Sequence, residues 1–152
     1  MKKRTDEPWI TAPAYGRLLP QFTVNLIVRD IARALTFYQE VLEAYVHYSD
    51  LDFAAVRVLG IELMLHADHS YEMNPWSDSL QEGTPRGLGA ELRLLGMDPD
   101  ELAQRARSND ALFKDVAVRG HGWREVMVQD PDGYVWAVGE LTTRDSAAID
   151  NR

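Results

Sequence analysis

The sequence contains no cysteine among its 152 residues. Disulfides, thiolate nucleophiles and zinc–thiolate centres are therefore excluded. It also lacks any run of about 18 consecutive apolar residues, so it predicts no membrane-spanning helix. No apolar segment follows the charged residues at the N-terminus, and we expect no secretory signal. These absences are typical of a cytoplasmic protein.

Basic residues are in the minority. The 16 lysines and arginines face 24 aspartates and glutamates, which gives a formal net charge of −8 at pH 7. Nucleic acids and anionic membrane surfaces are bound through basic patches, so we expect neither as a partner. The hydrophobic fraction of 45% suffices for a folded core. The length fits one domain, or two half-domains that share a core.

The same succession of predicted elements occurs twice. An alternating segment at 22–28 leads to Asp30 and a helical stretch over 31–42, and a second one at 88–95 leads to Asp98 and a helix from Pro99. Each helix is followed by three short strand-like segments, at 45–48, 53–58 and 61–66, and at 114–119, 124–129 and 135–140. The repeat predicts an α+β fold of two βαβββ modules.

This repeat divides the chain into five segments. We expect an extended N-terminal arm over 1–19, a first βαβββ module over 20–70, a linker or pocket flap over 71–86, a second βαβββ module over 87–142, and a C-terminal tail over 143–152. Trp9 and Tyr15 are the residues that would anchor the arm, on the surface of the module or on a second subunit.

Two motifs resemble those of a known family. Asp30 is followed by the segment Ala-Leu-Thr-Phe-Tyr38, and the segment Asp130-Pro-Asp-Gly-Tyr134 occurs far downstream. In this order they resemble the vicinal oxygen chelate superfamily, which includes lactoylglutathione lyases, extradiol dioxygenases, fosfomycin-resistance transferases and bleomycin-resistance proteins. The resemblance covers residues 20–142, with Glu43 as a departure where the family often has glycine. It implies a curved mixed sheet around a cleft, the glyoxalase/bleomycin-resistance fold, and a homodimer.

The resemblance also implies four metal-ligand positions, on the first and fourth strands of each module. By register they fall on Thr23, Glu62, Gly89 (Leu88 or Ala90 after a slip of one residue) and Ala137. Of the four, Glu62 alone is a usual ligand, whereas a catalytic divalent site needs about three nitrogen or oxygen ligands from the protein. We therefore expect no cofactor at this position. A displaced divalent-metal site made by Glu62, His66 and His69 stays an alternative.

Alternation along the strands predicts which side chains face the cleft. They combine acids, one arginine and soft apolar groups: Thr23, Asn25, Glu62, Met64, Glu91, Arg93, Glu125, Met127 and Ala137. Trp76 and Trp123 add stacking surfaces, whereas Trp136 is predicted to lie in the core. The set suits a cationic or polyhydroxylated ligand, as in the acidic bleomycin-resistance proteins. Alternatively, Glu62, Glu91 and Arg93 form a buried salt-bridge network between the modules.

Evidence for catalysis in the sequence is sparse. Glu62, His121 and Glu125 are the candidate acid–base groups, and there is neither a phosphate-binding glycine loop nor a nucleophile elbow. Three functions stay open. A metal-independent small-molecule-binding protein is favoured, a metal-dependent lyase or dioxygenase-type enzyme with a displaced site is the alternative, and a structural or regulatory module with a filled cleft is the third.

Overall fold

The computed structural model describes residues 1–75, 77–80 and 83–142. Trp76 and the predicted tail over 143–152 lie outside the described residues. The chain forms two compact units, Met1–Thr84 and Pro85–Arg152. In the described part of the chain, no helix is both long enough and apolar enough to cross a membrane.

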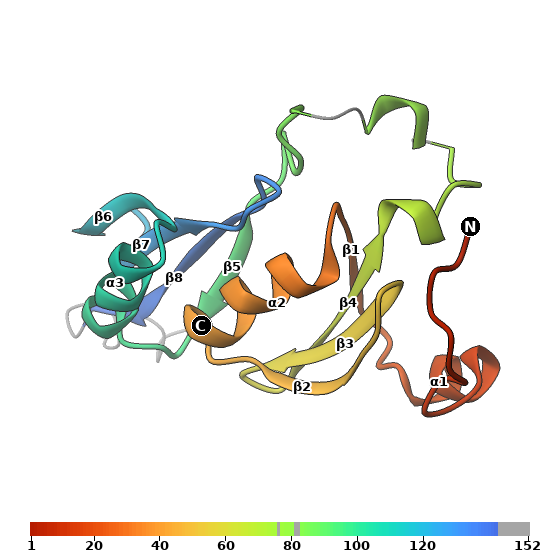
Figure 1. Cartoon of the computed structure of the whole chain (residues 1–152). Coiled ribbons are helices and arrows are strands. Elements are labelled where there is room, and N and C mark those ends of the chain that lie inside the picture. Colours follow the sequence, from red (N-terminus) through yellow and green to blue (C-terminus); the bar gives the residue numbers. More distant parts are fainter. Residues whose placement is uncertain (76, 81–82, 143–152) are drawn as a thin grey trace. The chain divides into compact units, whose positions relative to one another are not determined.

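Each unit contains a four-stranded mixed sheet and the helix that follows its first strand (Figure 1). In the first unit the order is β1-β4-β3-β2, made by β1 (Val24–Val28), β2 (Tyr45–Ser49), β3 (Phe53–Val58) and β4 (Ile61–Ala67), with helix α2 (Ile31–Glu40). In the second it is β5-β8-β7-β6, made by β5 (Leu92–Leu95), β6 (Leu112–Val118), β7 (Trp123–Gln129) and β8 (Val135–Leu141), with α3 (Pro99–Ser108). The predicted α+β fold of two βαβββ modules is confirmed.

Side-chain caps start both module helices where the sequence predicts them. The Asp30 carboxylate accepts a hydrogen bond from the Arg33 amide at 2.7 Å, and Asp98 accepts one from the Asp100 amide at 2.8 Å. Such caps satisfy amide groups that have no partner within the helix. The apolar face of α2, which includes the fully buried Tyr38, packs into the core of the first unit. The caps thereby set the residue at which each helix begins.

The turn at 130–134 is built on a buried carboxylate. Asp130 is 3% exposed, and its Oδ1 accepts hydrogen bonds from the amides of Asp132, Gly133 and Tyr134, each at 2.9 Å. Gly133 has a φ of 108°, a conformation that side chains disfavour. The turn joins β7 to β8 in the register that pairs Gln129 with Val135.

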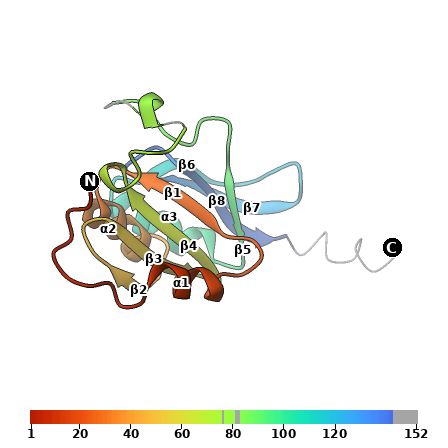
Figure 2. The same ribbon diagram turned by 90° about the vertical axis from the view of Figure 1, so that its right-hand side faces the viewer.

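The first sheet has one face toward α2 and an opposite face that carries polar and aromatic side chains. The β3–β4 register sets Phe53 beside His66, and Arg57 beside Glu62, on this opposite face. An irregularity in β2 between Val46 and Tyr48 adds a residue there. In Figures 1 and 2, α2 and α1 lie on opposite sides of this sheet.

The N-terminal arm is not extended throughout, contrary to the prediction for residues 1–19. It contains helix α1 (Ala12–Leu18), whose cap residue Thr11 accepts a hydrogen bond from the Ala14 amide at 3.3 Å. Pro13 lies in the first turn, where a missing amide hydrogen has little consequence. The capping threonine and the early proline are sequence signals that would have identified this helix.

The first strand of the second module is shorter than predicted, since β5 begins at Leu92 rather than at residue 88. Gly87 and Gly89 have φ angles of 72° and 85°, and the Ala90 amide donates to the Gly87 carbonyl at 2.9 Å. The two glycines thus form a turn before the strand. Gly89, predicted as a ligand position on a strand, lies in this turn instead.

Candidate functional site

A cavity of about 330 Å³ lies in the first unit, between the N-terminal arm and the face of the sheet opposite α2. We call it the arm pocket. Six ring-bearing side chains line it, Trp9, Tyr15, Tyr48, Phe53, His66 and Tyr71. Apolar residues, among them Ile10, Leu19 and Met64, and the charged residues Lys2, Arg4 and Asp52 line the rest. The arm supplies one side of this wall, and the strands supply the other.

Ring contacts hold the arm against the strands. Trp9 stacks on Tyr48 of β2, with ring centroids 5.8 Å apart and planes 8° from parallel. Tyr15 of α1 meets Phe53 of β3 edge to face at 5.5 Å. Such aromatic pairs add specific geometry to the burial of apolar area. The aromatic side chains of the arm therefore form a fixed wall of the pocket.

Glu62 on β4 is hydrogen-bonded to α1. Its Oε1 accepts a hydrogen bond from the Tyr15 hydroxyl at 3.2 Å, and its Oε2 lies 3.6 Å from Nε2 of His47 and 3.5 Å from Nε of Arg57. Burial raises the pKa of the Tyr15 phenol, and the Glu62 charge raises it further. The phenol therefore stays protonated and keeps donating to Glu62.

His66 presents a neutral imidazole to the pocket. Its Nδ1 lies 2.7 Å from Oδ1 of Asn25 on β1, and its ring contacts Phe53 at 4.8 Å and Tyr71 at 4.7 Å. Burial lowers the pKa of His66 to about 4, against an opposing effect of the Asp50 charge. At neutral pH the ring is thus uncharged, with one nitrogen that donates and one that accepts.

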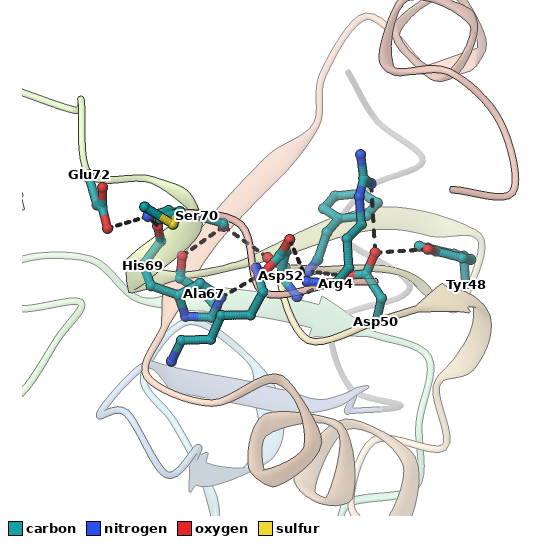
Figure 3. A network of polar contacts seen from close by, with 11 residues as sticks. Arg4, Tyr48, Asp50, Asp52, Ala67, His69, Ser70 and Glu72 are labelled. Carbon is teal, nitrogen blue, oxygen red and sulfur yellow. Dashed lines mark hydrogen bonds and ion pairs between the residues drawn. The ribbon is translucent and has the colours of Figure 1, made fainter. Parts of the chain in front are cut away.

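Two carboxylates, the buried Asp52 and the partly buried Asp50, bind the start of the arm (Figure 3). Asp52, 3% exposed, accepts hydrogen bonds from the amides of Lys3 at 2.7 Å and Arg4 at 3.3 Å, and lies 2.7 Å from Nε2 of His69. Burial opposes ionisation of Asp52, but these hydrogen bonds outweigh it and lower its pKa. Asp50 accepts from the Tyr48 hydroxyl at 2.8 Å and lies 3.7 Å from the Arg4 guanidinium.

The predicted ligand-binding residues fall into two groups. The first unit carries Thr23, Asn25, Glu62 and Met64, and the second carries Glu91, Arg93, Trp123, Glu125, Met127 and Ala137. Of the first group, Met64 lines the arm pocket and Asn25 orients His66. Thr23 lies just before β1, and its hydroxyl donates to the Pro20 carbonyl at 3.4 Å.

The residues at the implied metal positions do not fit a divalent ion. Ala137 and Gly89 have no side-chain ligand atom, and Glu62 already has Tyr15 as a partner. The displaced cluster is not assembled either, because residues four apart on a strand lie about 13 Å apart. His66 pairs with Asn25 instead. Among the described residues, no group of three or more acidic or histidine side chains could hold a metal ion.

His69, the last member of that displaced cluster, pairs with Asp52. It belongs to a short 3-10 turn after β4, Asp68–Ser70, rather than to the strand itself. The change of direction after β4 therefore carries His69 to the carboxylate that binds the arm, so its position supports the arm and not a metal.

The charged residues of the second unit compensate one another. Glu125, 1% exposed, accepts a hydrogen bond from Arg93 at 2.7 Å and lies 3.4 Å from Nε of Arg119. Arg93 also pairs with Glu91 at 2.5 Å, and His121 lies 3.0 Å from Arg93 and 3.5 Å from Glu125. We call these five residues the Glu125 network. It is centred on Glu125, whereas the predicted network included Glu62.

Trp123 belongs to the same surface. The Arg93 guanidinium carbon lies 4.5 Å from the centre of the Trp123 ring, and His121 meets this ring edge to face at 5.7 Å. Arg93 and Met127 are both register partners of Ala137. Trp123 therefore already packs against a protein cation, which is a favourable arrangement for an indole.

Sequence reasoning missed the aromatic wall. Phe53, Tyr48 and Tyr71 were not predicted as ligand-binding residues, and Trp9 and Tyr15 were predicted as anchors alone. Phe53 and Arg57 are four residues apart on one strand and therefore share a strand face, and Arg57 is the register partner of Glu62. This spacing is a signal that would have placed Phe53 on the pocket face. The place of the arm depends on contacts between distant residues, which no local pattern contains.

Comparison with known proteins agrees with this architecture. The lactoylglutathione lyase of Agrobacterium tumefaciens is similar with a TM-score of 0.60 at 17% identity, over 80% of this chain and 94% of that one. The fosfomycin resistance protein FosX of Listeria monocytogenes has a TM-score of 0.58 at 21% identity, over 83% of this chain and 96% of that one. A protein of unknown function from Agrobacterium tumefaciens str. C58 has a TM-score of 0.64 at 28% identity, over 81% and 96%.

No curated protein matches the sequence. The sequence profile of one family does match it, over residues 21–138, which is most of the chain and includes both modules. The profile and the two βαβββ modules agree with each other, and the chain therefore belongs to the Glyoxalase/Bleomycin resistance protein/Dioxygenase superfamily.

Proposed function

We propose that this protein binds a small aromatic molecule in the arm pocket, without a metal ion and without catalysis. The observation that carries the proposal is a cavity of about 330 Å³ in which aromatic rings lie on both sides, Trp9 and Tyr15 from the arm and Tyr48 and Phe53 from the strands. This volume lies in the range of about 300–1,000 Å³ typical of small-molecule sites. A planar ligand gains stacking and edge-to-face contacts in such a wall.

The charges around the pocket support an uncharged ligand, in contrast to the cationic or polyhydroxylated ligand that the sequence suggested. Two of the charged side chains that line the pocket already have partners: Asp52 accepts from two amides of the arm, and Arg4 pairs with Asp50. The third, Lys2, is exposed to solvent. A cation would compete with these partners for each carboxylate. A neutral aromatic ring leaves them in place.

The state of the candidate acid–base groups supports binding rather than turnover. His66, with a pKa of about 4, is a weak base at neutral pH. Glu125 and His121, predicted as catalytic candidates, both lie in the Glu125 network, and Glu62 accepts from Tyr15. The activities in the names of the similar structures belong to those proteins.

The arm itself favours one second candidate. Trp9 and Tyr15 cover part of the strand face. This cover favours the alternative function, a structural or regulatory module whose cleft is filled by its own side chains. The cavity that remains beside these rings supports binding over that alternative. A homodimer, implied by the family resemblance, stays a proposal that light scattering of the purified protein will test.

The test combines metal analysis with a ligand screen. The untagged protein is analysed for metal before and after soaking with Ni²⁺, Zn²⁺, Mn²⁺ and Fe²⁺, and is then screened by thermal shift against neutral aromatic compounds. We expect far less than one metal per chain and saturable binding that Trp9→Leu weakens. Trp123→Leu, in the second unit, is the matched control. About one tightly held metal per chain, or equal loss in both variants, would overturn the proposal.

A further inference from the structure

His66, on β4, is placed where it could distinguish aromatic ligands that carry a hydrogen-bond donor from those that do not. It lines the arm pocket, and the register pairs it with Phe53 on the pocket face. The rings of Phe53 and Tyr71 both contact it, with centroids at 4.8 Å and 4.7 Å. The hydrogen bond with Asn25 fixes the rotation of the imidazole about its own axis. The ring is therefore held in one orientation before a ligand arrives.

The partner of Nδ1 determines the tautomer. Oδ1 of Asn25 is an amide oxygen, which accepts and never donates, so Nδ1 must carry the hydrogen. A neutral imidazole has a single N–H hydrogen, and Nε2 then has a free lone pair. No described residue forms a hydrogen bond with Nε2 of His66. The burial that keeps His66 uncharged maintains this state at neutral pH.

We infer that the arm pocket selects planar, neutral aromatic molecules with an N–H or O–H donor, which donates to Nε2 of His66. This inference rests on the proposed function and narrows its ligand class. An aromatic ring without a donor would cover Nε2 of His66 and offer it no partner in place of water, which is unfavourable. A ligand with an acceptor at the same place would face the lone pair of Nε2.

Matched pairs of probes test the inference. Indole and 1-methylindole differ in the N–H donor, and phenol and anisole differ in the O–H donor. Binding is measured by calorimetry and by ligand-observed NMR on the full chain at pH 7. We expect indole and phenol to bind at least about tenfold more tightly than their methylated partners, which is the usual size of one hydrogen bond in a dry site.

Variants of His66 connect this preference to Nε2. His66→Phe keeps a ring but removes the acceptor, and it should reduce the indole preference to within about twofold. His121→Phe, in the second unit, is the matched control and should keep the preference. If His66→Phe does not fold, ¹⁵N NMR of the wild-type protein provides the second measurement: an unprotonated Nε2 is expected, and a protonated Nε2 would overturn the inference.

The outcomes separate the inference from the proposed function. Equal affinity for indole and 1-methylindole, or binding of naphthalene but of no donor-bearing probe, would overturn the inference and leave the proposed function standing. Failure of every aromatic compound in the screen to bind would overturn both. A preference for donor-bearing probes that persists in His66→Phe would assign the recognition to another residue and would also overturn the inference.

Discussion

Tyr15 donates its phenol hydrogen bond to Glu62 across 47 positions of the sequence, at 3.2 Å. The bond connects α1 to β4, and therefore connects the arm to the strand face that it covers. Glu62 occupies the one position of the four implied metal positions that has a usual ligand residue. In this chain that carboxylate holds a segment of the protein.

Replacement of Tyr15 by phenylalanine removes this bond but keeps the ring against Phe53. Because the acceptor is charged and partly buried, we expect the free energy of unfolding to fall by about 1–2 kcal/mol. Urea denaturation at pH 7 measures the change. Tyr45→Phe, at a residue that is 66% exposed, is the control and should leave stability unchanged. Equal stability of the Tyr15 and Tyr45 variants would show that the bond contributes nothing.

The pKa of His66 predicts a loss of stability in acid. The folded-state pKa of about 4 lies below the usual value of 6.5, so the unfolded chain binds more protons between these two values. The free energy of unfolding should therefore fall as the pH is lowered from 6.5 to 4. We expect a fall of about 2 kcal/mol from this group, after allowing for its partial exposure.

His66→Gln is the variant that isolates this effect. Glutamine does not titrate, and the other groups of the protein are unchanged, so the difference between wild type and variant reports His66 alone. Urea denaturation at pH 7, 6 and 5 should give a stability that falls less steeply in the variant. If the free energy of unfolding falls equally steeply with pH in both proteins, His66 does not have the lowered pKa that its burial implies.

Local signals explain why the fold was predictable. Asp30 and Asp98 each cap a helix a few residues ahead, and Asp130 closes its turn within four residues. These contacts depend on neighbours in the sequence, and so the pattern reveals them. The seven residues of α1 are too few for a stable isolated helix. That helix is stabilised by the contacts of Tyr15 with β3 and β4.

The candidate site was less predictable, because it depends on neighbours across the sheet. Asn25 and His66 are 41 positions apart and lie on the parallel pair β1 and β4. Alternation predicts that Glu62 and Met64 share a strand face, and Tyr15 and the arm pocket lie on the side of these two residues, but it does not state which residues meet. We expected Glu62 and His66 to share an ion because they are four residues apart. That spacing brings side chains together on a helix, but not on a strand.

The Glu125 network predicts a strong asymmetry between buried and exposed ion pairs. Glu125→Gln leaves Arg93 and Arg119, each about a third exposed, facing a neutral group, and we expect the free energy of unfolding to fall by about 2 kcal/mol. Asp115→Asn breaks an exposed pair with Arg107 and should have little effect. Thermal and urea denaturation measure both. Similar effects of the two variants would contradict the central position of Glu125.

The Asp52 carboxylate predicts that the arm can be loosened without disrupting the sheet. Its lowered pKa means that its stabilising effect is present above the usual carboxyl range and is lost as the pH falls through the folded-state value. Asp52→Asn should mimic that loss at pH 7, because a neutral amide accepts more weakly from the Lys3 and Arg4 amides. Hydrogen exchange of these two amides should become at least about tenfold faster, while exchange in β4 stays unchanged. Asp6→Asn, on the exposed part of the arm, is the control, and equal exchange in both variants would show that Asp52 does not hold the arm.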